Sequence, residues 1–331
     1  MGDWFASRFT TITGLDTAHF MGVMMKSAGF VKFAVVVLAP ALVLAGAASR
    51  PAATRPAGPP ERIRYGRPKK LCDLANQRID ESSGLACSRL RPGVFWTHND
   101  SGDRPRIYAF DAAGRDLGFF TVRGARAVDW EDMASFKLGR RAYLLLADVG
   151  DNASARRSCQ LYIVPEPPLD KAGRPRHGTA KVAVKITFTY DDGPHNCESV
   201  AVDPVDRKIY LATKEFPGQA KVYELPLPAR SPGKPLQAKA IASIDIPMAT
   251  AMDISPDGRR AVILSYGPAY EYVRRKGESW AAAFSRKPRR LAMPPRVQGE
   301  SICYGPAGRR LYLTSEGLPT PLWLVPVAAE K

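Results

Sequence analysis

The stretch ESVAVDPVDRKIYLATKEFPG, residues 198–218, decides the fold. It begins with a short apolar strand, continues through a turn that holds Asp and Pro, and ends in a second strand of alternating apolar residues. Short strands joined by a tight turn predict a β-hairpin. The chain has 27 Gly and 29 Pro, and apolar stripes of helical period are scarce after residue 70. The sequence therefore predicts an all-β protein.

The same hairpin pattern occurs five times along the chain. The other copies read SSGLACSRLRPGVFWTHNDSG (82–102), EDMASFKLGRRAYLLLADVG (131–150), TAMDISPDGRRAVILSYGP (250–268) and ESICYGPAGRRLYLTSEGLPT (300–320). Corresponding positions are 48, 67, 52 and 50 residues apart, at Ser83, Glu131, Glu198, Thr250 and Glu300. A period of this length with several strands in each unit is typical of a β-propeller. The copies predict five blades, and a sixth, degenerate blade is the alternative.

Further strands follow the hairpins. Third strands are expected in four units, at RIYAFD (106–111), QLYIVPEP (160–167), KVYELPLP (221–228) and PLWLVPV (321–327). Fourth strands are expected at 116–124, 183–192, 239–247 and 289–295. The fifth unit ends at Lys331 without a fourth strand, which residues 70–75 can supply. Such an exchange would close the ring with an N-terminal strand and cover an exposed sheet edge.

Residues 1–48 have the pattern of an export signal. Lys26 and Lys32 precede an apolar run, FAVVVLAPALVLAGAA (33–48), that ends in small residues. This pattern is typical of a secretory signal peptide, and the run is shorter than the roughly 20 residues of a membrane span. The residues upstream of it suggest that translation starts at Met24 or Met25. We expect a secreted, periplasmic or cell-surface protein without a membrane span in the mature chain; an uncleaved N-terminal anchor is the alternative.

Residues 49–69 are rich in Pro, Ala and Arg, and we expect a disordered linker there, ahead of a propeller domain at 70–331. The chain has a net charge of +16, of which +7 lies in residues 1–70. The remaining positive charge is mostly spread over hairpin turns, so we expect no nucleic-acid partner. The one denser basic stretch, residues 274–290, is a candidate binding patch.

Polar residues gather at positions that open on one face of a propeller. The innermost strand of each blade lines the channel, and its start shares a face with the loop after the second strand. The strand starts supply Glu81, Asp129, Glu131, Glu198 and Glu300. The loops supply His98, Asn99, Asp100, Asp148, Asp151, Asn152, Glu215 and Glu316, and His195 lies just ahead of Glu198. The sequence therefore predicts an acidic site at one mouth of the channel.

The three glutamates Glu131, Glu198 and Glu300 hold one register position and should point towards one axis. Two carboxylates about 5 Å apart at an effective dielectric constant of about 20 repel by about 3 kcal/mol. All three therefore need a cation, a basic neighbour such as Lys214, or a raised pKa. Hard oxygen ligands suit Ca²⁺ or Mg²⁺, and Ca²⁺ is favoured. The candidate metal ligands are Glu131, Glu198, Glu300, Asp148 and Asn99, and the candidate bases are His98 and His195.

The strand starts ESSGLA (81–86), WEDMA (130–134), CESVAV (197–202) and GESICYG (299–305) resemble those of gluconolactonase-type and phytase-like β-propellers. The resemblance spans residues 80–331 and implies a divalent ion at the channel mouth. In the gluconolactonase type the metal ligands are acids or Asn at the strand start, the position of Glu131, Glu198 and Glu300. Ser83 and Thr250 depart from that pattern, and the basic cluster of a phytase mouth is not evident.

Two functions fit these features, and propellers host both. The first is a monomeric protein that binds a small molecule, a polymer or another protein outside the cytoplasm at the acidic mouth. The second is a metal-dependent hydrolase of an ester, lactone or phosphoester, in which the metal activates water and His98 or His195 is the base. The signatures of other hydrolases and of nucleotide-binding loops are absent from the sequence.

Five Cys residues allow at most two disulfides in an exported chain. Cys159 opens the third strand of the second unit, and Cys197 opens the first strand of the third unit. Because both positions lie near one face of neighbouring blades, we predict a Cys159–Cys197 disulfide. The sequence does not assign partners to Cys72, Cys87 and Cys303.

Overall fold

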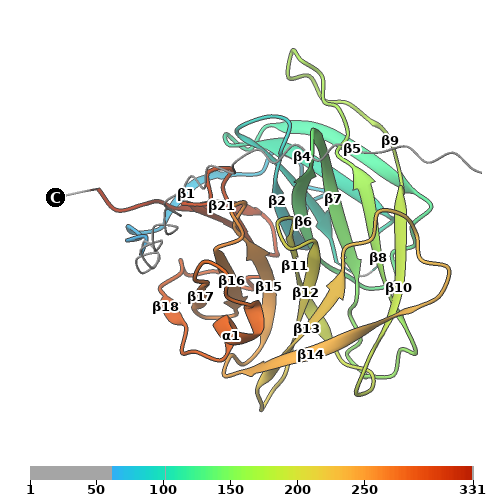
Figure 1. Ribbon diagram of the computed structural model, residues 1–331. Helices are drawn as coiled ribbons and strands as arrows, with labels where there is room; N and C mark the ends of the chain where they lie inside the picture. Colours follow the sequence, from blue (N-terminus) through green and yellow to red (C-terminus); the bar gives the residue numbers. More distant parts are fainter. Residues whose placement is uncertain (1–61, 101, 330–331) are drawn as a thin grey trace, which may run out of the picture. The chain divides into compact units, whose positions relative to one another are not determined.

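The computed structural model describes residues 62–100 and 102–329, which form β-sheets and one short helix (Figure 1). The prediction of an all-β chain is confirmed. Among the described residues, no helix has the length and hydropathy that crossing a membrane requires. The predicted signal peptide (1–48) and the linker up to residue 61 lie outside the described residues.

The described strands form repeated antiparallel units of four. The first unit is β2 (Ser82–Cys87), β3 (Val94–Asn99), β4 (Arg106–Asp111) and β5 (Asp116–Arg123). The second is β6 (Trp130–Leu138), β7 (Arg141–Asp148), β8 (Cys159–Pro165) and β10 (Val184–Tyr190). The third is β11 (Cys197–Asp203), β12 (Lys208–Thr213), β13 (Ala220–Pro226) and β14 (Leu236–Ile244). The fourth is β15 (Ala249–Ile254), β16 (Arg260–Ser265), β17 (Ala269–Val273) and β18 (Arg289–Leu291). The last is β19 (Ser301–Tyr304), β20 (Leu311–Thr314), β21 (Pro321–Val325) and β1 (Lys69–Asp73).

The first strand of each unit lies at the centre of the fold (Figure 1). The strands β2, β6, β11, β15 and β19 pack against one another in this order, and β19 packs in turn against β2. Four-stranded antiparallel units around a common centre are the arrangement of a β-propeller. Each hydrophobic cluster is shared by two neighbouring units, so the core lies in the gaps between units.

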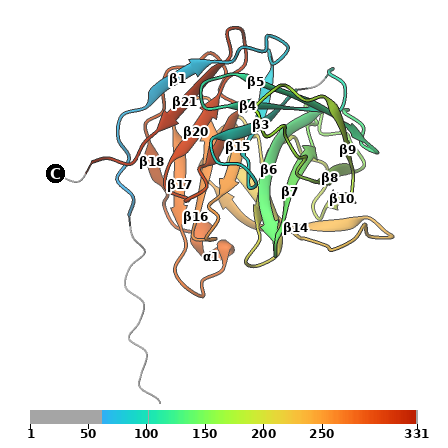
Figure 2. The same ribbon diagram turned by 90° about the horizontal axis from the view of Figure 1, so that it is seen from above.

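The N-terminal strand β1 completes the last unit, as the sequence predicts (Figure 2). It pairs antiparallel with β21, from Lys69 opposite Leu324 to Asp73 opposite Pro321. The two ends of the described chain thereby share one sheet.

The packed chain begins before residue 70, which corrects the expected extent of the disordered linker. Ile63 is buried, and its carbonyl accepts a hydrogen bond of 2.5 Å from the Arg289 guanidinium. The Tyr65 hydroxyl donates to Glu271 over 2.6 Å, and Tyr65 forms a β-bridge with Val327. Ile63 and Tyr65 therefore anchor the C-terminal end of the Pro-rich stretch to the propeller.

Three elements were not predicted. The strand β17 supplies a third strand in the fourth unit, and the helix α1 (Trp280–Phe284) follows it with Ser279 as its N-cap. The insertion of the second unit forms β9 (Gly178–Lys181), which pairs parallel with β5 of the first unit. In addition, β10 and β14 pair in parallel, so the second and third units share one eight-stranded sheet.

A buried carboxylate joins strands at the centre. Oδ2 of Asp132 in β6 accepts hydrogen bonds from the backbone N–H groups of Val200 in β11, over 2.9 Å, and Met252 in β15, over 3.0 Å. Asp253 in β15 makes a similar contact with the next unit: it accepts a hydrogen bond from the backbone N–H of Tyr304 in β19 over 2.7 Å. These acidic side chains satisfy backbone donors that strand pairing leaves free.

Candidate metal and ligand site at the channel mouth

A repeated backbone irregularity positions the residues at the mouth. At the starts of β2, β6, β11 and β15 the register with the next strand shifts across one residue: Ser83, Glu131, Glu198 and Thr250, respectively. A β-bulge leaves such a residue unpaired and turns its side chain in a new direction. Glu300 directly precedes β19 and completes the series. The register read from the sequence therefore marks a bulge that recurs from unit to unit.

The two hydroxyl residues of this series hold the neighbouring strand starts in place. Oγ of Ser83 donates to the carbonyl of Glu131 over 2.6 Å. Oγ1 of Thr250 donates to the carbonyl of Gly299, next to Glu300, over 2.7 Å. Ser83 and Thr250, which lack an acidic side chain, thus fix the backbone at Glu131 and next to Glu300.

Five carboxylates converge at the mouth in two overlapping groups. Asp100 forms one group with Glu300 and Glu316 and a second with Asp129 and Glu131. Within each group the chosen oxygen atoms all lie within 4.8 Å of one another. Glu131 and Glu300 are buried, whereas the other three are half-buried. Spacing of this kind suits a divalent cation, which several carboxylate oxygens can bind at once.

Gly150, in the loop after β7, makes room for the second group. A Cβ atom at this position would lie 2.2 Å from Oε1 of Glu131 and 2.4 Å from Oδ2 of Asp129. Both distances are shorter than any non-bonded contact allows, so a residue with a side chain would push the two carboxylates away. The sequence analysis did not single out Gly150, because a glycine in a loop is usually there to allow the backbone to turn.

A basic and a phenolic side chain link the remaining glutamates. Nζ of Lys214 donates to Oε1 of Glu198 over 2.6 Å and to the hydroxyl of Tyr266 over 2.8 Å. The Tyr266 hydroxyl donates to Oε1 of Glu300 over 3.0 Å, as does Nε2 of Gln298 over 2.9 Å. Oε2 of Glu198 is buried and has no hydrogen-bond partner within residues 62–100 and 102–329.

Tyr266 and Gln298 are site residues that the sequence search missed. Tyr266 directly follows β16, just as Lys214 follows β12 and Asp100 follows β3. This shared register was a usable signal for Tyr266. Gln298 lies in an irregular segment, and no repeat marks it.

Burial raises the pKa of several carboxyl groups at the mouth. For Glu131, burial and then the charge of Glu198 raise the pKa well above its usual value. Burial also raises the pKa of Glu198 to about 7, although Lys214 opposes the shift. The pKa of Glu316 rises to about 9 through burial and a hydrogen bond with Glu300. Burial raises the pKa of Asp129 as well. Without a cation, protons therefore neutralise part of the mouth at neutral pH.

Two predicted residues support the mouth from beside it. Asp148 is buried and forms an ion pair of 2.9 Å with Arg156, and it accepts a hydrogen bond from the backbone N–H of Asp129. Asp151 accepts hydrogen bonds from the backbone N–H groups of Ala155 and Arg156 and so closes its own loop. Asp148 belongs to neither carboxylate group, and its contacts hold Arg156 and the backbone of Asp129 beside them.

The other predicted polar residues lie around this centre. Nδ2 of Asn99 donates to the carbonyl of Arg78 over 2.7 Å, whereas its Oδ1 has no partner. Glu81 is exposed, and its charge contributes to the raised pKa of Glu316. Asn152 is exposed and accepts from Asn196, and Glu215 lies 3.7 Å from a ring nitrogen of His195.

Neither predicted histidine joins the carboxylates. His98 is fully buried, and its ring packs edge-on against Trp130, with centroids 5.3 Å apart. Burial lowers the pKa of His98. His195 pairs with Asp192 over 2.9 Å and packs against the rings of Tyr190, edge-on, and Tyr223. His98 therefore lies in the core, and His195 lies in a separate cluster with Asp192 and the two tyrosines.

The structure does not bear out the predicted Cys159–Cys197 disulfide: no two cysteines are bonded, and these two thiols contact backbone carbonyls. Both thiols lie in one hydrophobic cluster, but each has its own polar contact. The Cys159 thiol donates to the carbonyl of Val149 over 3.9 Å, and the Cys197 thiol donates to that of Ala212 over 3.3 Å. Lying near the same face was not enough to make the two sulfur atoms meet.

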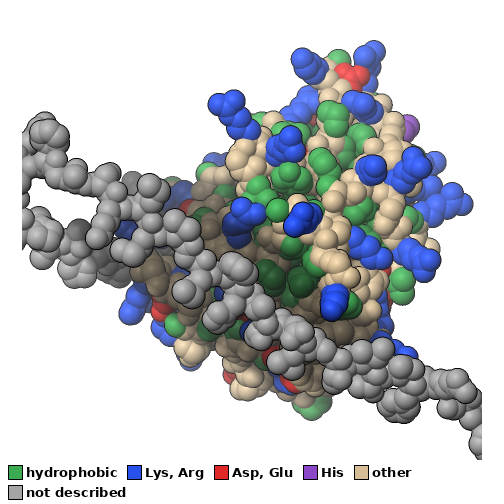
Figure 3. Space-filling view, turned by 45° about the vertical axis from the view of Figure 1, so that its right-hand side comes forward, with side chains coloured by type: hydrophobic (Ala, Val, Ile, Leu, Met, Phe, Trp, Pro, Cys, Tyr) green, Lys and Arg blue, Asp and Glu red, His purple; other side chains and the backbone are tan. Residues whose placement is uncertain are grey.

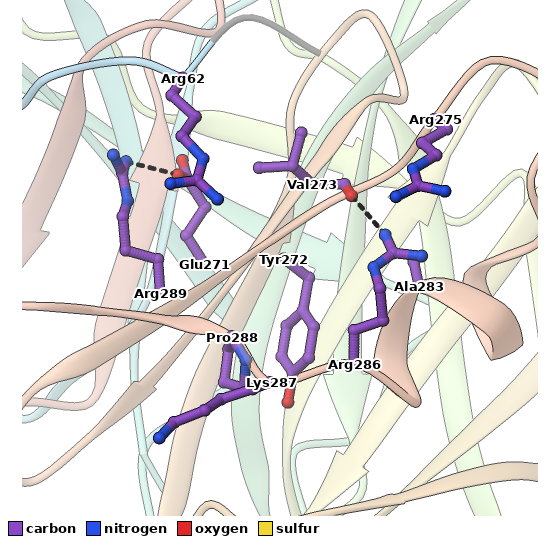
Figure 4. Close-up of a pocket in the computed structure, with 10 residues that line it drawn as sticks. All are labelled: Arg62, Glu271, Tyr272, Val273, Arg275, Ala283, Arg286, Lys287, Pro288 and Arg289. Carbon is purple, nitrogen blue, oxygen red and sulfur yellow. Dashed lines mark hydrogen bonds and ion pairs between the residues drawn. The ribbon is translucent and has the colours of Figure 1, made fainter. Parts of the chain in front are cut away.

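The basic stretch at residues 274–290 borders a cavity of about 450 Å³ between α1 and the strands β17 and β18. In Figure 4, Arg289 is directed to Glu271 and Arg286 to the carbonyl of Val273. Arg286 also pairs with Glu278, and Arg274 with Asp203. Much of this positive charge therefore stabilises the fold. On the face in Figure 3, Lys and Arg side chains are dispersed among hydrophobic ones.

No protein-family model and no curated protein sequence matches the chain. Solved structures do resemble it. A gluconolactonase from Xanthomonas campestris aligns with a TM-score of 0.39 and 13% identity, over 71% of this chain and 69% of the other. The structure of a nidogen–laminin complex aligns with a TM-score of 0.41 and 14% identity, over 71% and 72%. The propeller of Dos1 aligns with a TM-score of 0.36 and 6% identity, over 80% and 95%. The likeness is one of fold, at low sequence identity.

Proposed function

We propose that the chain is an exported, five-bladed β-propeller that binds a divalent cation, Ca²⁺ before Mg²⁺, at its acidic mouth. Through this cation it would bind an oxygen-rich ligand outside the cytoplasm. Two observations support five blades: the first strands of the units pack in a closed cycle, and every described strand except β9 belongs to one of the four-stranded units. The signal-like residues 1–48 support export.

The observation that carries the cation site is that Asp100 belongs to both carboxylate groups. Its position lets the acids of the first, second and last units act on one centre. The donor set consists of hard oxygen atoms, which suits Ca²⁺. Oε1 of Glu198 is paired with Lys214, and the buried Oε2, which has no hydrogen-bond partner among the described residues, is a further oxygen that a cation could bind.

A bound cation would neutralise the carboxylates and offer a positive centre to the oxygens of a ligand. Beside it, Lys214 would hold a carboxylate, phosphate or hydroxyl group through the third N–H of its ammonium, since Glu198 and Tyr266 accept the other two. Ser83 and Thr250 keep the strand starts fixed. The half-buried position of Asp100, Asp129 and Glu316 leaves the site open to solvent on one side.

Calorimetric titration of chelator-treated protein with CaCl₂ tests this function. We expect saturable binding, and we expect Glu131→Gln to weaken it about tenfold or more by removing one ligand charge. Glu224→Gln is the control, because it removes the same charge from a glutamate of β13 that pairs with Lys208 and belongs to neither carboxylate group. Calcium binding that is unchanged in Glu131→Gln, or absent from the wild type, would contradict the proposal.

One observation favours a hydrolase as the second function. Burial and the hydrogen bond with Glu300 raise the pKa of Glu316 to about 9, so that without a cation it holds a proton at neutral pH, whereas burial raises the pKa of Glu198 only to about 7. Carboxyl groups with separated pKa values can divide the roles of acid and base. A screen of lactones, esters and phosphoesters with and without added Ca²⁺ tests this function. Turnover that is lost in Glu316→Gln, compared at a Ca²⁺ concentration that saturates the variant wherever turnover needs the ion, would support the enzyme, and no turnover would leave the binding function alone.

A further inference from the structure

Two cysteines that the sequence could not assign lie in contact at the join between the first and last units. Cys87 ends β2, and Cys303 lies within β19. Their Sγ atoms are 3.7 Å apart, although 216 positions separate them in the chain. Both are buried to 2% exposure, in a cluster that also holds Leu85 and Leu322.

We propose that Cys87 and Cys303 form a disulfide bond that covalently closes the ring of blades. At this join the ring also depends on the pairing of β1 with β21 and on the packing of β19 against β2. The disulfide would link the innermost strands β2 and β19 covalently, whereas the pairing of β1 with β21 closes the ring at the outer edge of the last unit. The inference uses the proposed export of the chain but not the cation site.

Cys87 and Cys303 contact each other through sulfur, whereas the other three thiols contact backbone carbonyls. A disulfide has sulfur atoms about 2.0 Å apart, so rotation of two side chains already in contact can form the bond. Cys159 and Cys197 donate to backbone carbonyls instead, as described above. Cys72 is partly exposed and donates to the carbonyl of Ala112 over 3.7 Å.

The reaction needs a two-electron oxidant, for which an external disulfide serves, either a small molecule or a thiol–disulfide oxidoreductase. One cysteine thiolate attacks a sulfur of this disulfide and displaces a thiolate, which leaves a mixed disulfide on the chain. The second cysteine thiolate then attacks the chain's sulfur, so that the Cys87–Cys303 bond forms and the second external thiolate leaves. The two thiol protons end on the two external thiolates, and the external disulfide is reduced to two thiols.

Burial sets the time at which the bond can form. Burial raises the pKa of the Cys303 thiol well above its usual value, and the thiolate is the reactive form. The closed ring therefore protects the pair, and we infer that oxidation takes place while the last unit is still docking against the first. An oxidant added to the folded, reduced protein should act slowly on this pair.

Disulfide mapping of the whole chain tests the proposal. Reduced, denatured chain is refolded in a buffer of reduced and oxidised glutathione, then denatured without reductant in N-ethylmaleimide and digested for mass spectrometry. We expect the peptides of Cys87 and Cys303 to be joined, and Cys159 and Cys197 to carry the alkylating group. Alkylated Cys87 and Cys303 in the refolded protein would overturn the proposal, as would a bond between Cys159 and Cys197.

A melting experiment provides a second, independent reading. Reductant present during refolding should lower the Tm of the wild type by about 10 °C, because the bond closes a long loop. The Tm of Cys87→Ala/Cys303→Ala should not depend on reductant, whereas Cys159→Ala should behave as the wild type does. If reductant lowered the Tm of the double variant equally, another disulfide would be responsible. Should the double variant fail to fold, the mapping of the wild type still decides.

Discussion

The carboxylate of Asp132 in β6 accepts a hydrogen bond of 3.0 Å from the backbone N–H of Met252 in β15, two units away. The same oxygen holds the N–H of Val200. Asp132 therefore fixes three of the innermost strands relative to one another, and its side chain has no exposure to solvent.

Replacing Asp132 with Ala should lower the free energy of unfolding by about 3 kcal/mol or more. The change leaves buried N–H groups without acceptors, and each such group costs about 1–3 kcal/mol. Urea denaturation measures the effect. Asp170→Ala serves as the control and should leave stability unchanged, because its ion pair with Arg174 is exposed. Equal stability of the two variants would show that Asp132 does not tie the strands together.

Asp253 should make stability fall as the pH rises between about 4 and 6. Burial raises its pKa from 3.8 to about 6. In that range the folded chain keeps a proton that the unfolded chain has released, so raising the pH favours unfolding. Relative to Asp253→Asn, the wild type should lose up to about 3 kcal/mol over this range. Urea denaturation at several pH values gives the two profiles, and parallel profiles would contradict the assignment.

Calcium binding should release protons near neutral pH. Glu198 and Glu316, with pKa values of about 7 and 9, hold protons that a cation must displace. We expect roughly one to two protons per bound ion at pH 6.5, and an affinity that rises with pH up to about 9. Calorimetry in buffers of different ionisation enthalpy counts the protons. Binding that releases none would mean that the ion avoids these glutamates.

Replacing Gly150 with Ala should weaken calcium binding without unfolding the chain. The added methyl group would occupy the space of the Glu131 and Asp129 carboxylates, and at least one of them must leave the second group. Gly139→Ala is not a suitable control, because Gly139 has a positive φ of 60°. Gly233→Ala is suitable, since a Cβ there meets nothing within 4 Å. We expect affinity to fall about tenfold in Gly150→Ala alone, as measured by titration.

The repeat made much of this fold predictable from sequence. Hairpins of like pattern recur, so the first two strands of every unit and the register of Glu131, Glu198 and Glu300 could be predicted from the sequence alone. The strand β17 was missed because AYEYV is brief and runs into a charged stretch. Its pairing with β16 decides its conformation.

The chemistry of the centre was harder to predict. Asp132 and Asp253 look like polar interruptions of a strand, and their partners are backbone groups 68, 120 and 51 residues away. The pairing of cysteines depends on which side chains share a gap between units. Cys87 and Cys303 meet because the ring closes there, which no local pattern records. The acidic residues of the mouth could be predicted from their repeated register. Gly150 could not, because its role is to leave space for two carboxylates.

The parallel pairings of β9 with β5 and of β10 with β14 bear on aggregation. An unpaired outer strand can recruit a second chain by edge-to-edge addition. Here β5 is covered by β9, and β10 and β14 cover each other. Among the described outer strands, β9, β18 and β1 keep an open edge; β9 has four residues, β18 has three, and β1 begins with Lys69 and Lys70. Short, basic edges discourage such addition, so this chain should resist amyloid-like stacking even at high concentration.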